Sequence, residues 1–184
     1  AMHVAEVLGI PVEEVHPSVG DTDAIGYTAI SAGSSAVYKT GWASFAAARD
    51  LQRPLAAMAA LICDVPVAEV DVVDGDFTHR PNPELRLTLK ELAARQNTTG
   101  GPLVGRAGGA WGGESPGFAV HIVDVEVDPE TGKTDIIRYT ALQDPGTAVH
   151  PSYVEGQIQG GVVPGTGWAL NEEYVTDEIG SASG

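Results

Sequence analysis

The sequence predicts an α+β fold in which antiparallel or mixed sheets pack against helices. Three blocks support this prediction: a helical apolar pattern over residues 34–62, a hairpin pattern over 118–142 and a glycine-rich helical pattern over 152–170. The helical and strand patterns occupy separate blocks and do not alternate regularly. They therefore favour antiparallel pairing over a parallel sheet with crossover helices.

The first third of the chain is expected to be mainly helical. A short helix over about 2–8 leads through Gly-Ile-Pro to a strand near 12–18. A long helix follows over about 34–62, with alanines and larger apolar residues available for one buried face. Pro54 lies inside this helix and is expected to kink it or divide it in two, because proline lacks the amide hydrogen that a helix needs.

A short pattern occurs twice in this part of the sequence. Pro-Val-x-Glu-Val begins at Pro11 and again at Pro66, and Gly-Asp follows each copy, at 20–21 and at 75–76. The shared order of residues suggests one helix-turn-strand unit that is used twice. Two copies are too few for a solenoid, which needs at least three stacked repeats.

Local signals predict the elements between 88 and 117. Thr88 and Glu91 have the spacing of a capping box, which predicts a short helix to about Gln96. The segment 97–117 is rich in glycine and proline. It is expected to be a long loop that crosses a partner or a ligand.

The clearest hairpin pairs 118–128 with 133–142. Valines alternate with acidic residues in the first strand, Pro129 favours the turn, and Gly132 can adopt the left-handed conformation. After the glycine-rich helix, residues 172–176 have the pattern of a further strand.

Length and charge limit the classes of function. The chain of 184 residues fits one domain, with possible sub-lobes at 1–96 and 97–184. A net charge of −15 argues against nucleic acid and anionic membranes as partners, because both are polyanions. No run of about 18 apolar residues is present. The composition predicts a soluble, cytoplasmic protein.

The ends of the sequence suggest a fragment of a longer polypeptide, because residues 1–3 enter a helical pattern without a cap and 180–184 are all small. The single cysteine, Cys63, excludes an internal disulfide and is expected to be a buried structural thiol. Neither Asp21 and Asp23 nor the histidines have metal-ligand spacing, so no metal ligands are predicted.

The glycine-rich helix is a candidate binding site. Each glycine weakens a helix by up to about 1 kcal/mol relative to alanine, so these glycines need another role. Around Gly156 they would let a large ligand approach the backbone, and the Gln157 amide can both donate and accept hydrogen bonds. Tight helix–helix packing explains the same glycines equally well.

A second candidate site precedes the long helix. Ala32, Gly33, Ser34 and Ser35 combine a flexible glycine with two hydroxyls directly before the helix begins. A helix N-terminus offers backbone amides and the positive end of its dipole to an anion. An ordinary serine N-cap is the alternative interpretation.

Several motifs occur in a family-specific order. They are Leu8–Pro11, Gly20–Asp23 and Ala32–Ser35 in the first half, and Phe118–His121, Val125–Gly132, Asp144–Gly146 and Gly156–Gln157 in the second. In this order the chain resembles the large, molybdopterin-binding subunit of the xanthine dehydrogenase, aldehyde oxidase and carbon monoxide dehydrogenase family. The fold expected from the resemblance is that of a molybdopterin-binding domain.

The resemblance also implies the roles of the candidate residues. Gln157 takes the catalytic position beside an oxygen ligand of molybdenum, and the cofactor-binding residues are Ala32, Gly33, Ser34, Ser35, Gly156 and Gln157. The sequence departs from the family at Ser35, where relatives have arginine, and at Pro164, where they have glutamine. The general base of the family has no counterpart here and is expected downstream of Gly184.

For the parent protein, the resemblance implies a molybdenum-dependent oxidoreductase that hydroxylates or oxidises a small substrate with oxygen derived from water. Its cofactor would be molybdopterin with molybdenum, in the cytosine dinucleotide form. Its partners would be iron–sulfur and flavin subunits or domains in an oligomeric enzyme. The fragment alone is expected to be inactive. A non-catalytic subunit-interaction module is the alternative.

Overall fold

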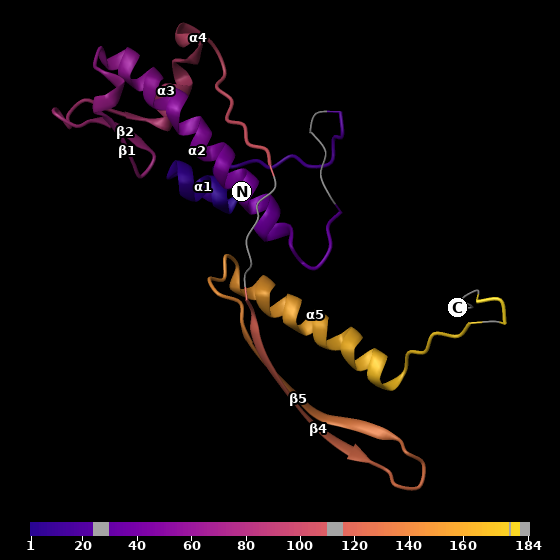
Figure 1. The fold of residues 1–184 in the computed structure, drawn as a ribbon. Helices are drawn as coiled ribbons and strands as arrows, with labels where there is room; N and C mark the ends of the chain where they lie inside the picture. The colour runs from indigo at the N-terminus through magenta and orange to yellow at the C-terminus, as the bar shows by residue number, and fades with distance from the viewer. Residues whose placement is uncertain (24–29, 110–115, 177, 181–184) are drawn as a thin grey trace. The chain divides into compact units, whose positions relative to one another are not determined.

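The structure is a computed structural model that describes residues 1–23, 30–109, 116–176 and 178–180 (Figure 1). Its contacts divide the chain into two compact units, 1–112 and 113–184. The first unit contains helices and a three-stranded antiparallel sheet, and the second contains an antiparallel hairpin and a helix. The predicted α+β class is confirmed.

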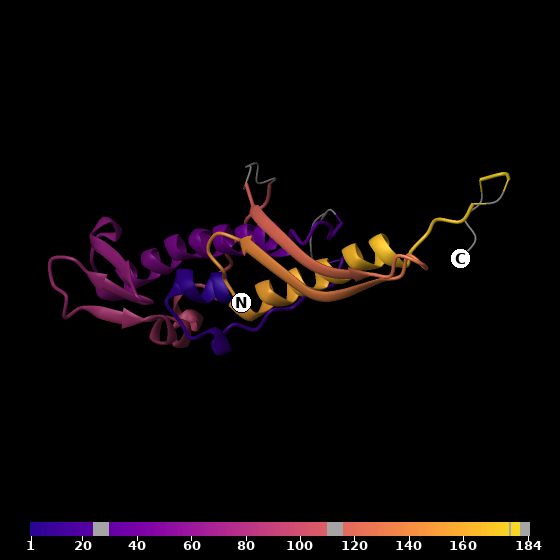
Figure 2. The ribbon, with the colours of Figure 1, turned by 90° about the horizontal axis from the view of Figure 1, so that it is seen from below.

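Two helices and a small sheet form the first unit. Helix α1 (Met2–Leu8) lies beside α2 (Ala36–Cys63), as Figures 1 and 2 show. The sheet has the order β1-β2-β3. Its strands and the helices after them are β1 (Val70–Val73), β2 (Asp76–His79), β3 (Arg86–Thr88), α3 (Leu89–Ala94) and α4 (Gln96–Thr99).

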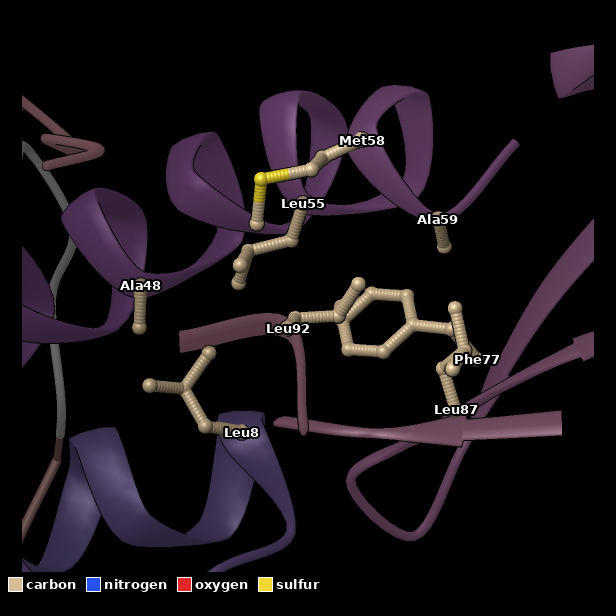
Figure 3. Packing of buried hydrophobic residues seen from close by; sticks show 8 residues of the cluster. All are labelled: Leu8, Ala48, Leu55, Met58, Ala59, Phe77, Leu87 and Leu92. Atoms are coloured by element: carbon tan, nitrogen blue, oxygen red, sulfur yellow. The ribbon is translucent and has the colours of Figure 1, made fainter. Parts of the chain in front are cut away.

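The core of this unit draws on five elements (Figure 3). Leu92 of α3 is fully buried. The other members of the buried cluster come from α1, α2, β2 and β3: Leu8, Ala48, Leu55, Met58, Ala59, Phe77 and Leu87. Since these residues are far apart in sequence, the core fixes the helices to the sheet.

Helix α2 runs through Pro54 without being divided. A proline inside a helix is unfavourable by about 3 kcal/mol. Ala48 before Pro54 and Leu55 and Met58 after it are buried in the same core, and each large apolar side chain contributes about 1.5–3 kcal/mol. Packing on both sides of the proline therefore outweighs its effect, so the predicted division is wrong, and the alternative, a kink at Pro54, stays a prediction.

The two copies of the repeat share backbone structure, but only in part. After α1, Gly9 is left-handed and the 3₁₀ helix η1 (Val12–Glu14) follows; after α2, Asp64 is left-handed and η2 (Val67–Glu69) follows. Only the second copy continues into a strand. The strand predicted near 12–18 is therefore wrong. Pro17 lacks the amide that a paired strand would use.

A close glycine contact joins the end of α1 to the turn between β1 and β2. Both Gly9 (φ 64°) and Gly75 (φ 80°) have positive φ. A Cβ added to Gly75 would lie 2.6 Å from the carbonyl oxygen of Gly9. Both the backbone conformation and the space therefore require glycine at Gly75.

The capping box predicted at Thr88 is confirmed. The Glu91 amide donates to Thr88 Oγ1 at 3.2 Å, and the Thr88 amide donates to Glu91 Oε2 at 2.8 Å. The Thr88 hydroxyl also donates to Glu91 Oε2, at 3.0 Å, and the Thr88 amide and hydroxyl together hold the pKa of the Glu91 carboxyl below its ordinary value of 4.5.

The segment after α4 packs on α2. A Cβ on Gly105 would lie 2.1 Å from the Ala47 carbonyl oxygen, and the Arg106 amide donates to Asp50 Oδ2 at 3.0 Å. This bond and the one from Arg53 lower the pKa of Asp50. The segment 100–109 has no helix or strand, and residues 110–115 of the predicted loop lie outside the described residues. Because this segment packs on α2, the boundary between the two units lies after residue 112. The sub-lobes suggested at 1–96 and 97–184 stay a prediction.

A long hairpin opens the second unit. Strands β4 (Phe118–Val127) and β5 (Thr134–Asp144) pair in antiparallel register, with a bulge next to Asp124. The turn closes with the Gly132 amide donating to the Asp128 carbonyl at 2.8 Å, and Gly132 has φ 74°. The predicted hairpin and its left-handed glycine are confirmed.

Helix α5 (Pro151–Leu170) completes the second unit. None of its residues is buried, and five are half-buried: Val154, Ile158, Val162 and Thr166, which recur every fourth residue, and Gly167. Residues 172–175 contain no strand and Thr176 forms only a single β-bridge, so a continuous strand at 172–176 is not present. Within the described part of the chain, no helix is both long enough and apolar enough to cross a membrane.

Candidate functional site

The segment before α2 has two consecutive residues with positive φ. Gly33 (φ 60°) and Ser34 (φ 53°) are both left-handed, whereas Ser35 has φ −85° and ψ 2°. Successive residues of opposite hand can turn consecutive amides toward the same side, as in an anion-binding nest, and Ser34 and Ser35 have the φ signs of such a pair. A Cβ on Gly33 would meet no atom within 4 Å, so this side of the backbone is open in the described structure.

The N-terminus of α2 carries no side-chain cap among the described residues. Ser35 Oγ donates to the Ala32 carbonyl at 2.7 Å, and the Lys39 amide donates to the Ser35 carbonyl at 2.9 Å. The amides of Ala36 and Val37 precede this first helical bond. The serine therefore stabilises the turn and does not act as an ordinary N-cap, which leaves the helix end suited to an external anion.

The glycines of α5 have open surroundings. A Cβ placed on Gly156, Gly160, Gly161 or Gly165 would meet no described atom within 4 Å, and Gln157 is exposed. The alternative of helix–helix packing therefore finds no support within the described residues. An open glycine surface beside a neutral amide allows a flat polar ligand to approach the helix backbone.

An aromatic stack lies at the start of α5, which the sequence analysis did not predict. The rings of His150 and Tyr153 are 3.9 Å apart between centroids at an interplanar angle of 20°, and Ser152 Oγ lies 3.1 Å from His150 Nδ1. A signal was available, since residues three apart lie on one face of a helix. The stack places two rings at the end of α5 where the helix dipole is positive.

The two motifs belong to different units. Ala32, Gly33, Ser34 and Ser35 lie in the first unit, and Gly156 and Gln157 lie in the second. The structure therefore describes each motif separately. No three His, Cys, Asp or Glu side chains of the described residues gather into a group that could hold a metal ion.

The chain matches a known family over nearly its whole length. The model of the family described as molybdopterin cofactor-binding domain matches residues 1–183. The nicotine 6-hydroxylase large subunit of Paenarthrobacter nicotinovorans is 30% identical over 191 residues, which cover 100% of this chain and 23% of that protein. The xanthine dehydrogenase molybdenum-binding subunit of Escherichia coli O157:H7 is 31% identical over 179 residues, which cover 95% of this chain and 24% of that protein.

Solved structures also resemble this chain. A reconstituted CO dehydrogenase from Oligotropha carboxidovorans superposes with a TM-score of 0.83 at 28% identity, over 99% of this chain and 23% of that one. Quinoline 2-oxidoreductase from Pseudomonas putida 86 superposes with a TM-score of 0.73 at 25% identity, over 99% of this chain and 24% of that one. The chain spans about a quarter of the length of these proteins.

Proposed function

Because this chain belongs to the molybdopterin cofactor-binding domain family, we propose that it holds the cofactor within the large subunit of a molybdenum hydroxylase. The observation that carries the proposal is the uncapped N-terminus of α2 behind the nest at Gly33–Ser35. A net charge of −15 does not oppose this role, since backbone amides bind phosphate without Lys or Arg.

The first motif fits the anionic end of the cofactor. The amides that follow Ser35 would bind phosphate oxygens of molybdopterin, and Gly33 keeps the approach clear of side chains. Ser34 would add a hydroxyl group, which can donate to the same oxygens. The Ser35 hydroxyl already donates to the Ala32 carbonyl, so Ser35 would contribute through its backbone. The family resemblance places an arginine at the position of Ser35, and this chain lacks its positive charge. Backbone amides and the dipole of α2 would therefore bind the phosphate without it.

The second motif fits the polar head of the cofactor. Gln157 would donate its side-chain amide to an oxygen ligand of molybdenum, and the open backbone at Gly156 lets the cofactor come close. A neutral amide can hydrogen-bond an electron-rich group without adding charge beside it. When bound, the molybdenum cofactor would supply the two-electron redox chemistry and the oxygen transfer.

The parent enzyme would hydroxylate a heteroaromatic ring or an aldehyde, or oxidise carbon monoxide, with oxygen derived from water. Its cofactor would be the cytosine dinucleotide form of molybdopterin. Electrons would leave through iron–sulfur and flavin subunits, and the general base would come from a part of the parent outside this chain. These 184 residues alone would bind and orient cofactor without turnover.

Cofactor analysis of the parent enzyme tests this proposal. Denatured wild-type protein should release one pterin and one CMP for each molybdenum atom. Gln157→Ala should lower turnover about a hundredfold, which is typical for loss of one preorganised donor. The pterin content of the purified variant should stay close to that of the wild type. Unchanged turnover in Gln157→Ala, or protein that contains neither pterin nor molybdenum, would contradict the proposal.

A subunit-interaction module is the second candidate, and the second unit favours it. None of the described residues in that unit is buried, although the hairpin and α5 carry large apolar side chains. The cofactor analysis separates the two candidates, because a module of this kind would copurify with its partners but without pterin.

A further inference from the structure

The first turns of α2 have little packing around them in the described structure. All five residues from Ala36 to Thr40 are exposed, and Gly41 is the first buried residue of the helix. The next buried residue, Ala48, lies about two turns further along. The nest at Gly33–Ser35 therefore lies at the end of a helical segment whose nearest buried point is Gly41.

The ring of His3, in α1, covers Gly41. A Cβ added to Gly41 would lie 2.7 Å from His3 Nε2 and 2.8 Å from His3 Cε1, so a side chain at this position would displace the ring. Gly41 is not among the glycines with positive φ, and a helix interior favours alanine over glycine about fivefold per residue. Space for the ring, and not backbone conformation, therefore explains this glycine.

Other contacts fix the carboxyl end of α1, which lies beside α2 in both views (Figures 1 and 2). Leu8 belongs to the buried cluster, and Gln52 Nε2 of α2 donates to the Val7 carbonyl at 2.7 Å. A Cβ on Gly9 would strike the backbone amide of Gly75 in the turn between β1 and β2. With its carboxyl end held in this way, α1 can keep the His3 ring of its first turn against Gly41.

A glycine inside a helix is a point at which the helix opens easily. Glycine loses more backbone freedom on folding than any other residue, and no side chain of its own shields its backbone from water. Turns with few buried contacts also open locally at a low free energy. Because the His3 ring buries Gly41, it opposes such opening in the turns that carry the nest. No hydrogen bond from a described residue reaches this ring, so its effect on α2 comes from packing.

We propose that His3 is a positioning residue for the cofactor site. Its ring, packed on Gly41, keeps the first turns of α2 closed and thereby fixes the amides that follow Ser35. The proposal rests on the proposed function, in which these amides bind a phosphate of molybdopterin. The phosphate would lose those bonds each time the turns open, so the rate of cofactor release depends on the contact between His3 and Gly41.

Hydrogen exchange and pterin release in the full-length parent enzyme test the proposal. His3→Ala removes the ring, and we expect the backbone amides within residues 36–42 to exchange about fivefold faster, the factor by which glycine weakens a helix. The release of pterin from the purified enzyme should accelerate by a similar factor. The double variant His3→Ala/Gly41→Ala should restore both rates, because the space vacated by the ring accepts a Cβ and alanine strengthens the helix.

Val4→Ala is the matched control. Val4 is a half-buried residue of the same helix that packs against the buried cluster, so its truncation weakens α1 without removing the His3 ring. Exchange within residues 36–42 and the release of pterin should both stay at the wild-type rate in this control. A merely structural role of His3 would instead give the same changes in His3→Ala and Val4→Ala. If His3→Ala does not fold, His3→Gln, which also lacks the ring, takes its place.

Three results would overturn the proposal. They are unchanged exchange in the variant without the ring, equal effects in Val4→Ala, and faster exchange that leaves the release of pterin unchanged. Failure of Gly41→Ala to restore the rates in the double variant would also contradict it. A wild-type enzyme without pterin would contradict the proposed function, whereas hydrogen exchange reports on the contact between His3 and Gly41 in either case. Failure of this proposal and failure of the proposed function are therefore distinguishable.

Discussion

The two units of this chain reach regular structure by different means. In the first, strands of only three or four residues are stable because helices and sheet share a buried cluster that includes Leu92 and Phe77. In the second, two strands of 10 and 11 residues and a helix of 20 residues form without one buried residue among those described. Long regular elements therefore need not mean a complete core. The first unit contains a buried cluster of its own, whereas no described residue of the second unit is buried.

Truncation of core side chains should produce the largest contrast between the units. In the 184-residue chain, Leu92→Ala should reduce the free energy of unfolding by about 2–5 kcal/mol, because it leaves a cavity in a fully buried site. The matched change Leu142→Ala in the exposed hairpin should reduce it by less than about 0.5 kcal/mol. Urea unfolding measures both. Equal losses would show that the two units share one core.

Two glycines, one in each unit, allow the same comparison for backbone packing. Gly75 and Gly132 have similar positive φ, at 80° and 74°, but only Gly75 has a neighbouring backbone atom that a Cβ would strike. Gly132→Ala should cost about 1 kcal/mol from conformation alone, and Gly75→Ala about 2–3 kcal/mol from conformation and overlap together. Thermal unfolding of both variants checks the difference. A smaller loss for Gly75→Ala would mean that α1 shifts freely away from the sheet.

A smaller difference in stability is expected between variants at the starts of α3 and α2. Thr88→Ala removes a capping bond that the Glu91 amide makes, and should reduce stability by about 1 kcal/mol. Ser35→Ala removes only a turn bond to Ala32, and should reduce stability by a few tenths of a kcal/mol. Chemical denaturation compares the variants. Similar losses of stability in the two variants would show that Ser35 is an ordinary N-cap.

Acid should weaken both units slightly, through carboxylates on their surfaces. The pKa of Glu91 is lowered by bonds from Thr88, and the pKa of Asp128 by the Thr131 hydroxyl and the Glu130 amide. A lowered folded-state pKa contributes stability above the unfolded value and loses it as the pH falls through the folded value. The melting temperature should therefore drop below about pH 4.5, and Glu91→Gln should flatten that drop. An unchanged acid profile in Glu91→Gln would contradict the assignment.

Elements with local signals were predictable from the sequence, and those decided by distant contacts were not. The hairpin turn at Gly132 and the cap at Thr88 depend on neighbouring residues, and both are confirmed. Continuity of α2 through Pro54 depends on packing against β2, β3 and α3, which the sequence does not reveal. The missing strand after Pro11 depends on a pairing partner in the same way.

The candidate site was predictable only as a set of positions. The sequence indicated Ala32–Ser35 and Gly156–Gln157, but not the geometry that distinguishes a cap from a nest. That distinction rests on the left-handed Ser34 and on the Ser35 hydroxyl, which bonds backward to Ala32. Hydroxyl rotamers and φ signs of single residues follow from the folded turn, so composition and spacing could not supply them.

Cofactor content of the parent enzyme carrying Gly33→Val tests the central claim, that the nest before α2 holds molybdopterin. The matched control is Gly100→Val, since Gly100 also has positive φ and open space around it in the same unit. Both variants place a valine at a positive φ, 60° at Gly33 and 113° at Gly100, but only Gly33→Val places a side chain where the cofactor would approach. We expect Gly33→Val to lose most of its pterin and molybdenum at a melting temperature no lower than that of Gly100→Val, which should keep both. Full cofactor content in Gly33→Val would contradict the account.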